Sequence, residues 1–538
     1  MIEPASRLPT HEVANQPGPP PASDPWAADA ALRGHAAAFG ADPAPPAALG
    51  ARVAAEDAWA LGREARRHPP EARLFDRGGR RLDEVAFHPA YHALMRMGAE
   101  GGYAAVAWDG RPGGHATHAA MVYLLSQVEP GVCCPLTMTY AAVPAMEADP
   151  GLAALWRPRL AARGYDPRVA PVEEKAAATL GMAMTEKQGG SDLRANATRA
   201  EAHGDAWRLT GHKWFCSAPM SDGFLTLAQA PGGLTCFVVP RWLPEGRNAV
   251  HLQRLKDKLG NRANASAEIE YHGATAHRLG PEGQGVRTIL RMVHHTRLDT
   301  AVAPAGLMRA ALAEAHHWVS GRTAFGRRLV DQPLMRRVLA DLALDWEGAL
   351  ALGLWVAARM DEPGSAPLAR LAVALAKLLA NKRCPVVVVE AMEALGGMGY
   401  VDDTGLPDLL REAPLNGIWE GSGNVIALDA LRTLAREPEA GAALHEALDA
   451  ARGGARAYDA GLEAFRARWP GAVAEGDARL FAERAATLLT ASVLLRFAPD
   501  AVGEGYARAR LDPDGGRMPG AVSGLDEAAI LARLAPAA

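Results

Sequence analysis

The chain has few lysines, cysteines and aromatic residues, and it has no strong net charge. Of its 538 residues five are cysteine, and aromatic residues make up 6%. The formal net charge of −4 at pH 7 argues against a global attraction to nucleic acid or to an anionic membrane. Only seven of the 57 basic residues are lysine; we attribute this arginine bias to codon usage rather than to guanidinium chemistry.

The cysteine and histidine patterns predict neither structural disulfides nor a metal site. The cysteines are odd in number and lack Cys-x-x-Cys spacing, which is typical of buried free thiols in a reducing compartment. The histidine pairs at 294–295 and 316–317 have no carboxylate or cysteine at a fixed spacing, so no metal is predicted. The Pro-rich stretch at 16–24 is neither a signal peptide nor a membrane span, and we expect a cytoplasmic protein.

Composition and hydrophobic periodicity divide the chain into an arm and four regions. The Pro-rich arm covers residues 1–24, and apolar residues at helical spacing then indicate a helical domain over 25–179. Short alternating or β-branched runs between turn residues indicate an antiparallel β domain over 180–287. Helical spacing returns over 288–437 and in an Ala-rich region over 438–538. The predicted fold is mainly α, with a central antiparallel β domain and an additional C-terminal helical domain.

Three separated segments combine small residues, hydroxyls, and aromatic or acidic groups. They are residues 184–192 (MTEKQGGSD), 213–217 (KWFCS) and 418–424 (IWEGSGN). Glycines let a backbone turn tightly against a planar ring, and hydroxyls can bind carbonyls or phosphates. Taken alone, the first segment is equally typical of a polar turn, and the second of a half-buried strand. Together they suggest one site for a large polar cofactor.

With residues 255–262 (LKDKLGNR), these segments resemble the AidB-like branch of the acyl-CoA dehydrogenase family of flavoproteins. The resemblance runs from about residue 10 to about residue 437, and more weakly to the end. It implies a helical, β, helical order with FAD between the β domain and the second helical domain. It also implies an acyl-CoA or a related small molecule as substrate, and a homo-oligomer, expected to be a tetramer.

The resemblance also implies a role for individual residues around FAD. Thr185 is expected at the flavin pyrimidine, Ser191 near the phosphates, Phe215 beside the isoalloxazine and Ser217 near its N5. The expected cofactor-binding set is Met182, Met184, Thr185, Gly190, Ser191, Phe215, Cys216, Ser217, Arg322, Phe325, Gln332, Glu393, Gly396, Gly397, Ser422, Gly423 and Asn424.

Part of this set departs from the family pattern. Residues 322–326 (RTAFG) resemble a segment that reaches the ADP half of FAD in a neighbouring subunit, a contact that suits the planar fork of Arg322. The glutamine that follows is shifted by one position, to Gln332. Glu393 stands where the family has Gln, and Met398 where it has Asn. Gly396 and Gly397 remain, although two glycines here are also typical of a helix C-cap.

Glu420 is the expected catalytic base. Removal of a proton α to a thioester carbonyl needs a positioned carboxylate, and residues 419–424 (WEGSGN) resemble the family segment that carries it. The alternative is a capping element in which Ser422 caps the following helix. Thr296 lies where some relatives carry the base instead, which favours Glu420. Arg297 resembles an arginine near the acyl pocket, and a structural ion pair is an equally good interpretation.

Two further hypotheses concern function. The AidB-like branch is associated with DNA alkylation damage and with duplex DNA binding through the C-terminal region. Residues 441–538 contain 11 Arg and no Lys against 13 Asp and Glu, so charge alone gives no support to this interpretation, although a stripe such as Arg466, Arg468, Arg508, Arg510 and Arg517 stays a candidate. A flavin-stabilised scaffold with negligible turnover is the third hypothesis. The primary prediction is an FAD-dependent acyl-CoA dehydrogenase-like oxidoreductase.

Overall fold

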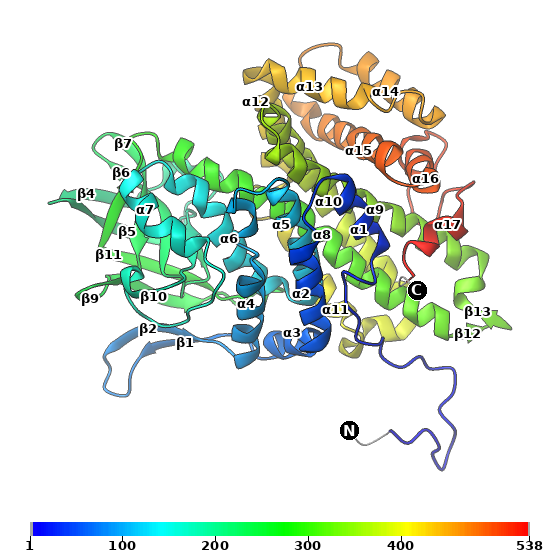
Figure 1. The fold of residues 1–538 in the computed structure, drawn as a ribbon, viewed down its shortest axis with the longest axis horizontal. Coiled ribbons are helices and arrows are strands. Elements are labelled where there is room, and N and C mark those ends of the chain that lie inside the picture. The colour runs from blue at the N-terminus through cyan, green and yellow to red at the C-terminus, as the bar shows by residue number, and fades with distance from the viewer. Residues whose placement is uncertain (1–3, 536–538) are drawn as a thin grey trace.

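The computed structural model describes residues 4–535 (Figure 1). Helices of the N-terminal part form a layer against the rest of the molecule. One of them, α5, is buried along its whole length, including its polar residues His115, His118 and Gln127. These helices are α1 (Ala30–Ala38), α2 (Ala44–Ala55), α3 (Ala58–Arg67), α4 (Pro89–Gly101), α5 (Gly114–Val128), α6 (Pro130–Met146) and α7 (Pro150–Leu160).

A β-hairpin interrupts this helical layer, where the sequence analysis expected helices only. Strands β1 (Glu71–Phe75) and β2 (Arg81–Ala86) pair antiparallel between α3 and α4. The hairpin contacts the central β region, because Asp83 Oδ1 accepts a hydrogen bond of 2.9 Å from the Leu252 backbone N–H. Tertiary contact of this kind decides strand formation more than local propensity does.

The central region is a seven-stranded sheet that closes on itself. Strand order is β10-β11-β5-β4-β6-β3, and β7 pairs with both β11 and β6. The sheet is mainly antiparallel, as predicted, with β3 and β4 parallel to β6. The strands are β3 (Leu180–Ala183), β4 (Arg199–His203), β5 (Ala206–Ser217), β6 (Gly223–Ala230), β7 (Gly233–Pro240), β10 (Val250–Leu255) and β11 (Ser266–Leu279), beside the short pair β8 (Trp242–Leu243) and β9 (Gly246–Arg247).

Long helices resume after the sheet. They are α8 (Gly285–Gly321), α9 (Pro333–Asp361), α10 (Ala366–Ala394), the short α11 (Leu406–Glu412), and α12 (Gly423–Arg436). With 37 residues, α8 is about 55 Å long at 1.5 Å per residue. A small hairpin follows it, β12 (Thr323–Ala324) with β13 (Arg327–Arg328). Figure 1 shows this hairpin at the opposite end of the molecule from the sheet.

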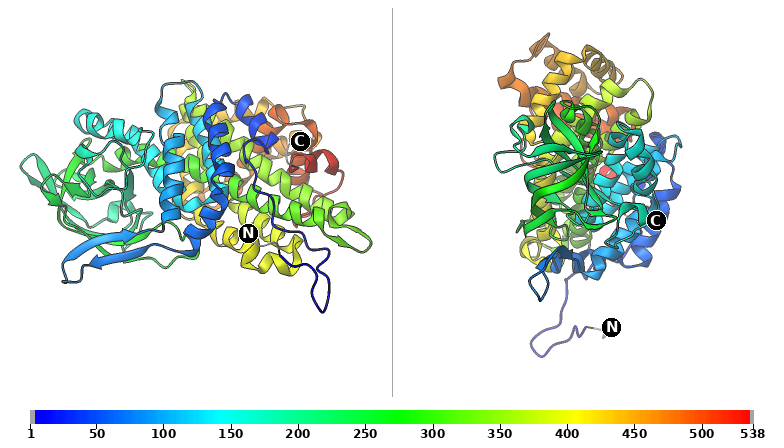
Figure 2. Two further views of the ribbon diagram at one scale, coloured as in Figure 1. Left: turned by 60° about the horizontal axis from the view of Figure 1, so that its bottom comes forward. Right: turned by 90° about the vertical axis from the view of Figure 1, so that its left-hand side faces the viewer.

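The C-terminal helices pack on α9 and α10 and share their core. They are α13 (Pro438–Asp449), α14 (Arg456–Arg468), α15 (Ala478–Phe497), α16 (Asp500–Leu511) and α17 (Glu527–Ala532). Figure 2 shows the sheet and the helical body as two adjoining parts. Within residues 4–535, none of the helices combines the length and the apolar character that a membrane crossing requires.

Candidate active site

Glu420 lies in the turn before α12, in a backbone conformation that non-glycine residues rarely adopt. Its φ is 58°, in the left-handed region, which for a non-glycine residue must be held by its surroundings. Two neighbours on α8 hold it. Thr296 Oγ1 donates to Glu420 Oε2 at 2.7 Å, and Arg297 Nε donates to the Glu420 carbonyl at 3.2 Å. The structure therefore brings Thr296, Arg297 and Glu420 together.

Arg297 also forms an ion pair. Its Nη1 lies 2.6 Å from Asp429 Oδ2 on α12, so the ion-pair interpretation of this residue describes its contacts here. The side chain links α8, the Glu420 turn and α12.

A buried lysine that the sequence analysis did not select holds the turn from the other side. Lys377 Nζ, on α10, donates to the carbonyls of Asn416 at 2.8 Å and Gly421 at 2.9 Å. Asn416 in turn accepts a 2.7 Å hydrogen bond from Trp419 Nε1 on its side-chain oxygen. The two carbonyls bracket Glu420, so Lys377 fixes the segment that carries the carboxylate.

Burial moves both charged groups toward neutrality. It raises the pKa of Glu420, and the Thr296 hydrogen bond, Lys377 and Arg297 oppose that rise. Burial also lowers the pKa of Lys377 to about 7, against the attraction of Glu420. A carboxylate with a raised pKa takes up a proton more readily, which is the property required of a general base near neutral pH.

On the sheet, Phe215 and Ser217 lie on one side of β5 while Cys216 lies on the other. Phe215 is 49% exposed, and the Cys216 side chain is fully buried in the core of the sheet region. Because side chains alternate along a strand, Cys216 leaves only its backbone for a ligand at this face. Phe215 and Ser217 present an aromatic ring and a hydroxyl there.

A partly buried lysine ends a chain of polar groups that leads to Ser217. Lys258 Nζ donates to the Asn264 carbonyl at 2.6 Å and to Ser266 Oγ at 3.1 Å. Ser266 Oγ lies 3.3 Å from Ser217 Oγ. Burial lowers the pKa of Lys258 to about 8. The sequence analysis used residues 255–262 only for the family resemblance, and the structure places the partly buried Lys258 behind Ser217.

Cys134, on α6, is partly buried against the core that α6 shares with the sheet. Burial raises the pKa of its thiol to about 12, Lys258 and the Ser217 hydroxyl lower it, and the Glu420 charge raises it further. The Ser217 hydroxyl and the Glu420 charge therefore both act on the Cys134 thiol. Sequence reasoning missed Cys134, because a cysteine in an apolar helix is typical of a buried thiol.

The segment at 184–192 is fixed by Glu186. Its buried carboxylate pairs with Lys213 Nζ at 2.7 Å and accepts from Thr198 Oγ1 at 2.7 Å. Burial would raise the pKa of Glu186, but Lys213 lowers it to about 2. The Thr185 carbonyl accepts from Trp214 N–H at 2.8 Å. Two of the three segments singled out in the sequence are therefore joined.

The other residues expected at the cofactor in and beside this segment differ in exposure. A Cβ added to Gly190 would lie 2.5 Å from Thr185 Oγ1, so only glycine fits there. Ser191 is exposed, and Met182 and Met184 are partly buried at the end of β3.

Residues 422–424 begin α12. Ser422 occupies the N-cap position, but its side chain makes no capping hydrogen bond, so the capping interpretation does not account for its hydroxyl. Gly423 is partly buried beside Lys382. Asn424 Oδ1 accepts a 3.1 Å hydrogen bond from Arg479 on α15.

Another group of expected cofactor residues lies far from Glu420. Arg322 follows α8, and 26 residues of helix separate it from Thr296, about 39 Å. Phe325 is 95% exposed with a φ of 52°, and Gln332 Nε2 donates to the Ala324 carbonyl at 3.1 Å. These side chains cannot reach a ligand at Glu420 in the same protomer.

The end of α10 is also distant from the Glu420 turn. Glu393, Gly396 and Gly397 are exposed there, and Gly396 has a left-handed φ of 62°. Glu393 follows Lys377 by 16 residues of α10, about 24 Å.

The N-terminal arm contacts Arg322. Asn15 Nδ2 donates to the Thr323 carbonyl at 2.8 Å, and the Thr323 N–H donates to Asn15 Oδ1 at 2.6 Å. Arg322 Nη1 donates to the Asn15 carbonyl at 2.9 Å. The arm therefore orients the arginine that the resemblance assigns to a pyrophosphate.

The residues present suit a flavin at the face of β5. An exposed aromatic ring at Phe215 and a hydroxyl at Ser217 are suitable neighbours for a flat, polar ring system. The buried Asn264 amide has no hydrogen-bond partner for either Nδ2 or Oδ1 within residues 4–535. Because an unpaired buried amide costs free energy, a polar ligand at this site would satisfy it.

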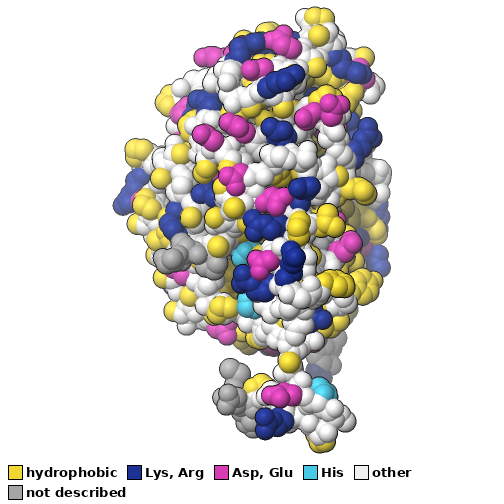
Figure 3. All heavy atoms as spheres, turned by 90° about the vertical axis from the view of Figure 1, so that its right-hand side faces the viewer, with side chains coloured by type: hydrophobic (Ala, Val, Ile, Leu, Met, Phe, Trp, Pro, Cys, Tyr) yellow, Lys and Arg dark blue, Asp and Glu magenta, His cyan; other side chains and the backbone are white. Residues whose placement is uncertain are grey.

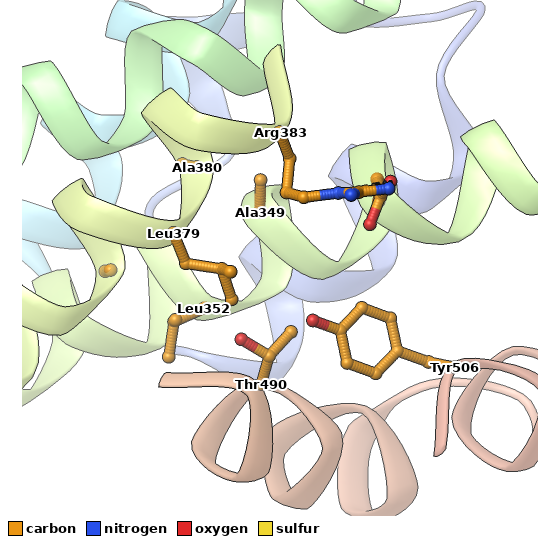
Figure 4. A pocket seen from close by; sticks show the side chains of 9 residues that line it. Ala349, Leu352, Leu379, Ala380, Arg383, Thr490 and Tyr506 are labelled. Atoms are coloured by element: carbon orange, nitrogen blue, oxygen red, sulfur yellow. Dashed lines mark hydrogen bonds and ion pairs between the residues drawn. The ribbon is translucent and has the colours of Figure 1, made fainter. Parts of the chain in front are cut away.

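The C-terminal helices are fixed to the body by a buried charge cluster. Arg510 on α16 pairs with Asp345 at 2.8 Å and with Asp341 at 2.7 Å on α9. Arg383 and Tyr506 lie on either side of a small cavity of about 10 Å³ between α9, α10, α15 and α16 (Figure 4). The cavity is too small for an organic ligand.

The candidate arginine stripe for DNA is largely engaged by acidic groups. Arg510 is only 15% exposed in its side chain, and Arg466 pairs with Asp449 at 2.7 Å. On the face shown in Figure 3, basic and acidic side chains are interspersed. DNA binding therefore stays a hypothesis that rests on the resemblance.

Comparison with protein families assigns most of the chain. Residues 15–167 match the AidB N-terminal domain of the adaptive response protein, residues 181–274 the middle domain of acyl-CoA dehydrogenases, and residues 283–435 their C-terminal domain. The putative acyl-CoA dehydrogenase AidB of Escherichia coli K12 is 42% identical over 519 residues, which cover 94% of this chain and 95% of that protein.

The chain belongs to the AidB-like branch of the acyl-CoA dehydrogenase family. Acyl-CoA dehydrogenase family member 11 of Caenorhabditis elegans is 35% identical over 69% of this chain and 63% of that protein. The crystal structure of C. elegans ACDH-11 in complex with C11-CoA matches with a TM-score of 0.83 at 27% identity, over 98% of this chain and 95% of that one. Family membership supports a dehydrogenase-like oxidoreductase, and members of the family use FAD.

Proposed function

We propose that this acyl-CoA dehydrogenase-family protein oxidises an acyl-CoA, or a related small thioester, with FAD as cofactor and Glu420 as the catalytic base. The observation that supports it most is the Glu420 carboxylate itself. It has a raised pKa, and the hydrogen bond from Thr296 Oγ1 at 2.7 Å fixes its orientation. Within residues 4–535 no lysine or arginine forms an ion pair with this carboxylate, which is bonded instead to the Thr296 hydroxyl.

Phe215, Ser217 and Thr185 would hold the flavin at the face of β5, with the Asn264 amide and the Ser266 hydroxyl beside it. Arg322 and Phe325 would reach the ADP half in a neighbouring protomer, because Arg322 lies about 39 Å along α8 from Thr296. The bound flavin supplies the acceptor for the hydride that leaves the substrate β carbon.

Glu420 accepts the proton from the substrate α carbon. As the C–H bond breaks, its electron pair forms the new carbon–carbon double bond, and a 2-enoyl thioester is the product. Thr296 points the carboxylate, and Lys377 and Arg297 keep the turn in its left-handed conformation. The positive charge of Lys377 also limits the rise of the Glu420 pKa.

The test is anaerobic reduction of the flavin by a panel of acyl-CoAs. We expect the visible flavin band of the full-length protein to bleach with at least one acyl-CoA. Glu420→Gln should retain the flavin and lose about 10²–10⁴-fold in the rate of bleaching. Glu439→Gln, on the exposed start of α13, is the matched control and should bleach at the unaltered rate.

Each contrary result identifies the part of the proposal that fails. Purified protein without flavin contradicts the cofactor. Flavin that no acyl-CoA reduces contradicts the dehydrogenase activity and favours the DNA-associated or scaffold hypotheses. Bleaching at an unchanged rate in Glu420→Gln contradicts the base.

A further inference from the structure

Three side chains with metal-ligating atoms converge where α3 ends and α4 begins. Glu64 and His68 are one helical turn apart at the end of α3, and His88 is the N-cap residue of α4. One ligand atom from each of the three lies within 4.8 Å of the others. The His68 and His88 rings are 4.6 Å apart at their centroids, and Glu64 Oε2 is 3.5 Å from His68 Nδ1.

The ligand types indicate which class of ion fits. Two imidazoles and one carboxylate suit borderline divalent transition ions such as Zn²⁺, whereas Mg²⁺ and Ca²⁺ prefer oxygen ligands alone. The spacing of Glu64 and His68 places both on one face of α3. Ligation requires the stacked rings to turn until their lone pairs converge. The 56% exposure of the His68 side chain leaves room for that turn.

We propose that Glu64, His68 and His88 bind one zinc-type divalent ion, with water completing a tetrahedral set. The sequence analysis predicted no metal because it considered only histidine pairs adjacent in sequence. The sequence signal for this site is a Glu-x-x-x-His pair on a helix. The third residue, a histidine 20 positions later, comes close to that pair only in the folded chain.

The ion would close the base of the β1–β2 hairpin. Residues 69–87 leave the helical layer at His68 and return at His88, and the hairpin between them contacts the sheet. Arg81 Nη2 donates to the Leu252 carbonyl at 2.8 Å, and the Val85 N–H contacts Met220 Sδ at 3.3 Å. A clip between the two ends removes the entropy of an open loop, so the bound ion stabilises the docked hairpin.

A second histidine pair on the protein provides a matched control. The rings of His251 and His272 are 4.3 Å apart, and His272 Nε2 is 3.0 Å from Glu270. Within residues 4–535, however, only the set of Glu64, His68 and His88 brings three ligand atoms together. The two clusters therefore contain the same residue types, two histidines and one glutamate, but only the first brings their ligand atoms close together.

The experiment is calorimetric titration of the full-length protein, freed of metal by a chelator, with ZnCl₂. We expect the unaltered chain to bind one equivalent of Zn²⁺. The affinity should fall by about ten- to a hundredfold in Glu64→Gln and in His88→Asn. Asparagine at position 88 removes the imidazole but can still cap α4. His272→Asn should bind as the unaltered chain does, and MgCl₂ should give no such equivalent. Equal binding in Glu64→Gln and the unaltered chain, or an equal loss in His272→Asn, overturns the site.

Amide hydrogen exchange tests the structural role separately. Zn²⁺ should slow exchange in residues 71–86 of the unaltered chain and have no effect on those residues in Glu64→Gln. Exchange that is indifferent to Zn²⁺ in a chain that binds it overturns the clip. Neither measurement depends on flavin or acyl-CoA, so failure here is independent of failure of the proposed function.

Discussion

Two clusters of buried charge differ in how their members are paired. At the Glu420 turn, the Lys377 ammonium donates to two carbonyls and the carboxylate of Glu420 accepts from a hydroxyl. Between α9 and the C-terminal helices, carboxylates meet guanidinium groups directly. Asp345 is bonded by Arg383 and Arg510, each through Nε at 2.8 Å.

The pKa shifts of the two clusters run in opposite directions. Burial raises the pKa of Glu420 and lowers that of Lys377 to about 7. In the second cluster burial would raise the pKa of Asp345, but Arg510 and Arg383 outweigh it and lower it. Burial would lower the pKa of Arg510, but Asp345 and Asp341 raise it. The first cluster can exchange a proton near neutral pH, whereas the second holds its charges and serves as a clamp.

The largest expected effect comes from breaking the clamp. Asp345→Asn removes the buried carboxylate that two partly buried arginines share, which should destabilise the protein by about 3–5 kcal/mol. Chemical denaturation of the full chain measures it. Glu463→Gln is the control, because Glu463 pairs with Arg452 at the surface and should give no measurable shift. Similar shifts for the two variants would contradict the distinction between a buried clamp and a surface pair.

A smaller effect should follow from changing the charge at the active site. Lys377→Met should slow flavin reduction by about tenfold at neutral pH, because the cation that opposes the rise of the Glu420 pKa is lost. The base acts only when ionised, so the rate increases with pH, and the variant should need a higher pH to reach its plateau. Stopped-flow reduction across pH measures both.

Lys377→Arg separates the charge of Lys377 from its structural role. It keeps a cation and donors for the Asn416 and Gly421 carbonyls, and its pH profile should stay close to that of the unaltered chain. A Lys377→Met profile that falls in height without moving along the pH axis would show that Lys377 only holds the turn.

The smallest predicted effect extends the comparison to the far end of α8. Asn15→Ala removes two hydrogen bonds to Thr323 and loosens the arm that orients Arg322. FAD should be retained about fivefold more weakly, as expected when exposed hydrogen bonds of roughly 1 kcal/mol are lost. Release of flavin fluorescence on titration with denaturant or on dilution measures it. The control is Thr10→Ala in the same arm, because within residues 4–535 the Thr10 side chain is hydrogen-bonded only to His11. This variant should retain FAD as the unaltered chain does. Equal weakening in both variants would contradict a role for Asn15.

The sequence predicted the order of helical and β regions because periodicity and turn residues are local signals. It missed the β1–β2 hairpin, since EARLF and RLDEVA are rich in charge and pair only where the sheet is available to receive them. The motif around Glu420 and its neighbours Thr296 and Arg297 were found through the family resemblance, and the structure places them in contact.

The contacts of Lys377 and Lys258 could not be predicted in the same way. In the sequence, Lys377 merely interrupts an apolar run. Nothing local indicates that its ammonium reaches carbonyls 39 and 44 residues further along the chain. Lys258 stands in a polar stretch of the sequence, and its contacts with Asn264 and Ser266 form only where the chain returns to pair β11 with β5. Cys134 escaped notice because α6 gives no sign of which face meets the sheet.

In the proposed function, the length of α8 sets the distance between the two subunits that share one flavin site. Since a helix neither stretches nor folds back, a protomer with Glu420 at one end cannot bring its own Arg322 to the same flavin. In the proposed function, a chain altered at Glu420 and a chain altered at Arg322 would repair each other when mixed, because one type of shared site would then contain both intact residues. Cofactor loading would likewise fall on dilution, so that occupancy of the site reports how much of the protein is assembled.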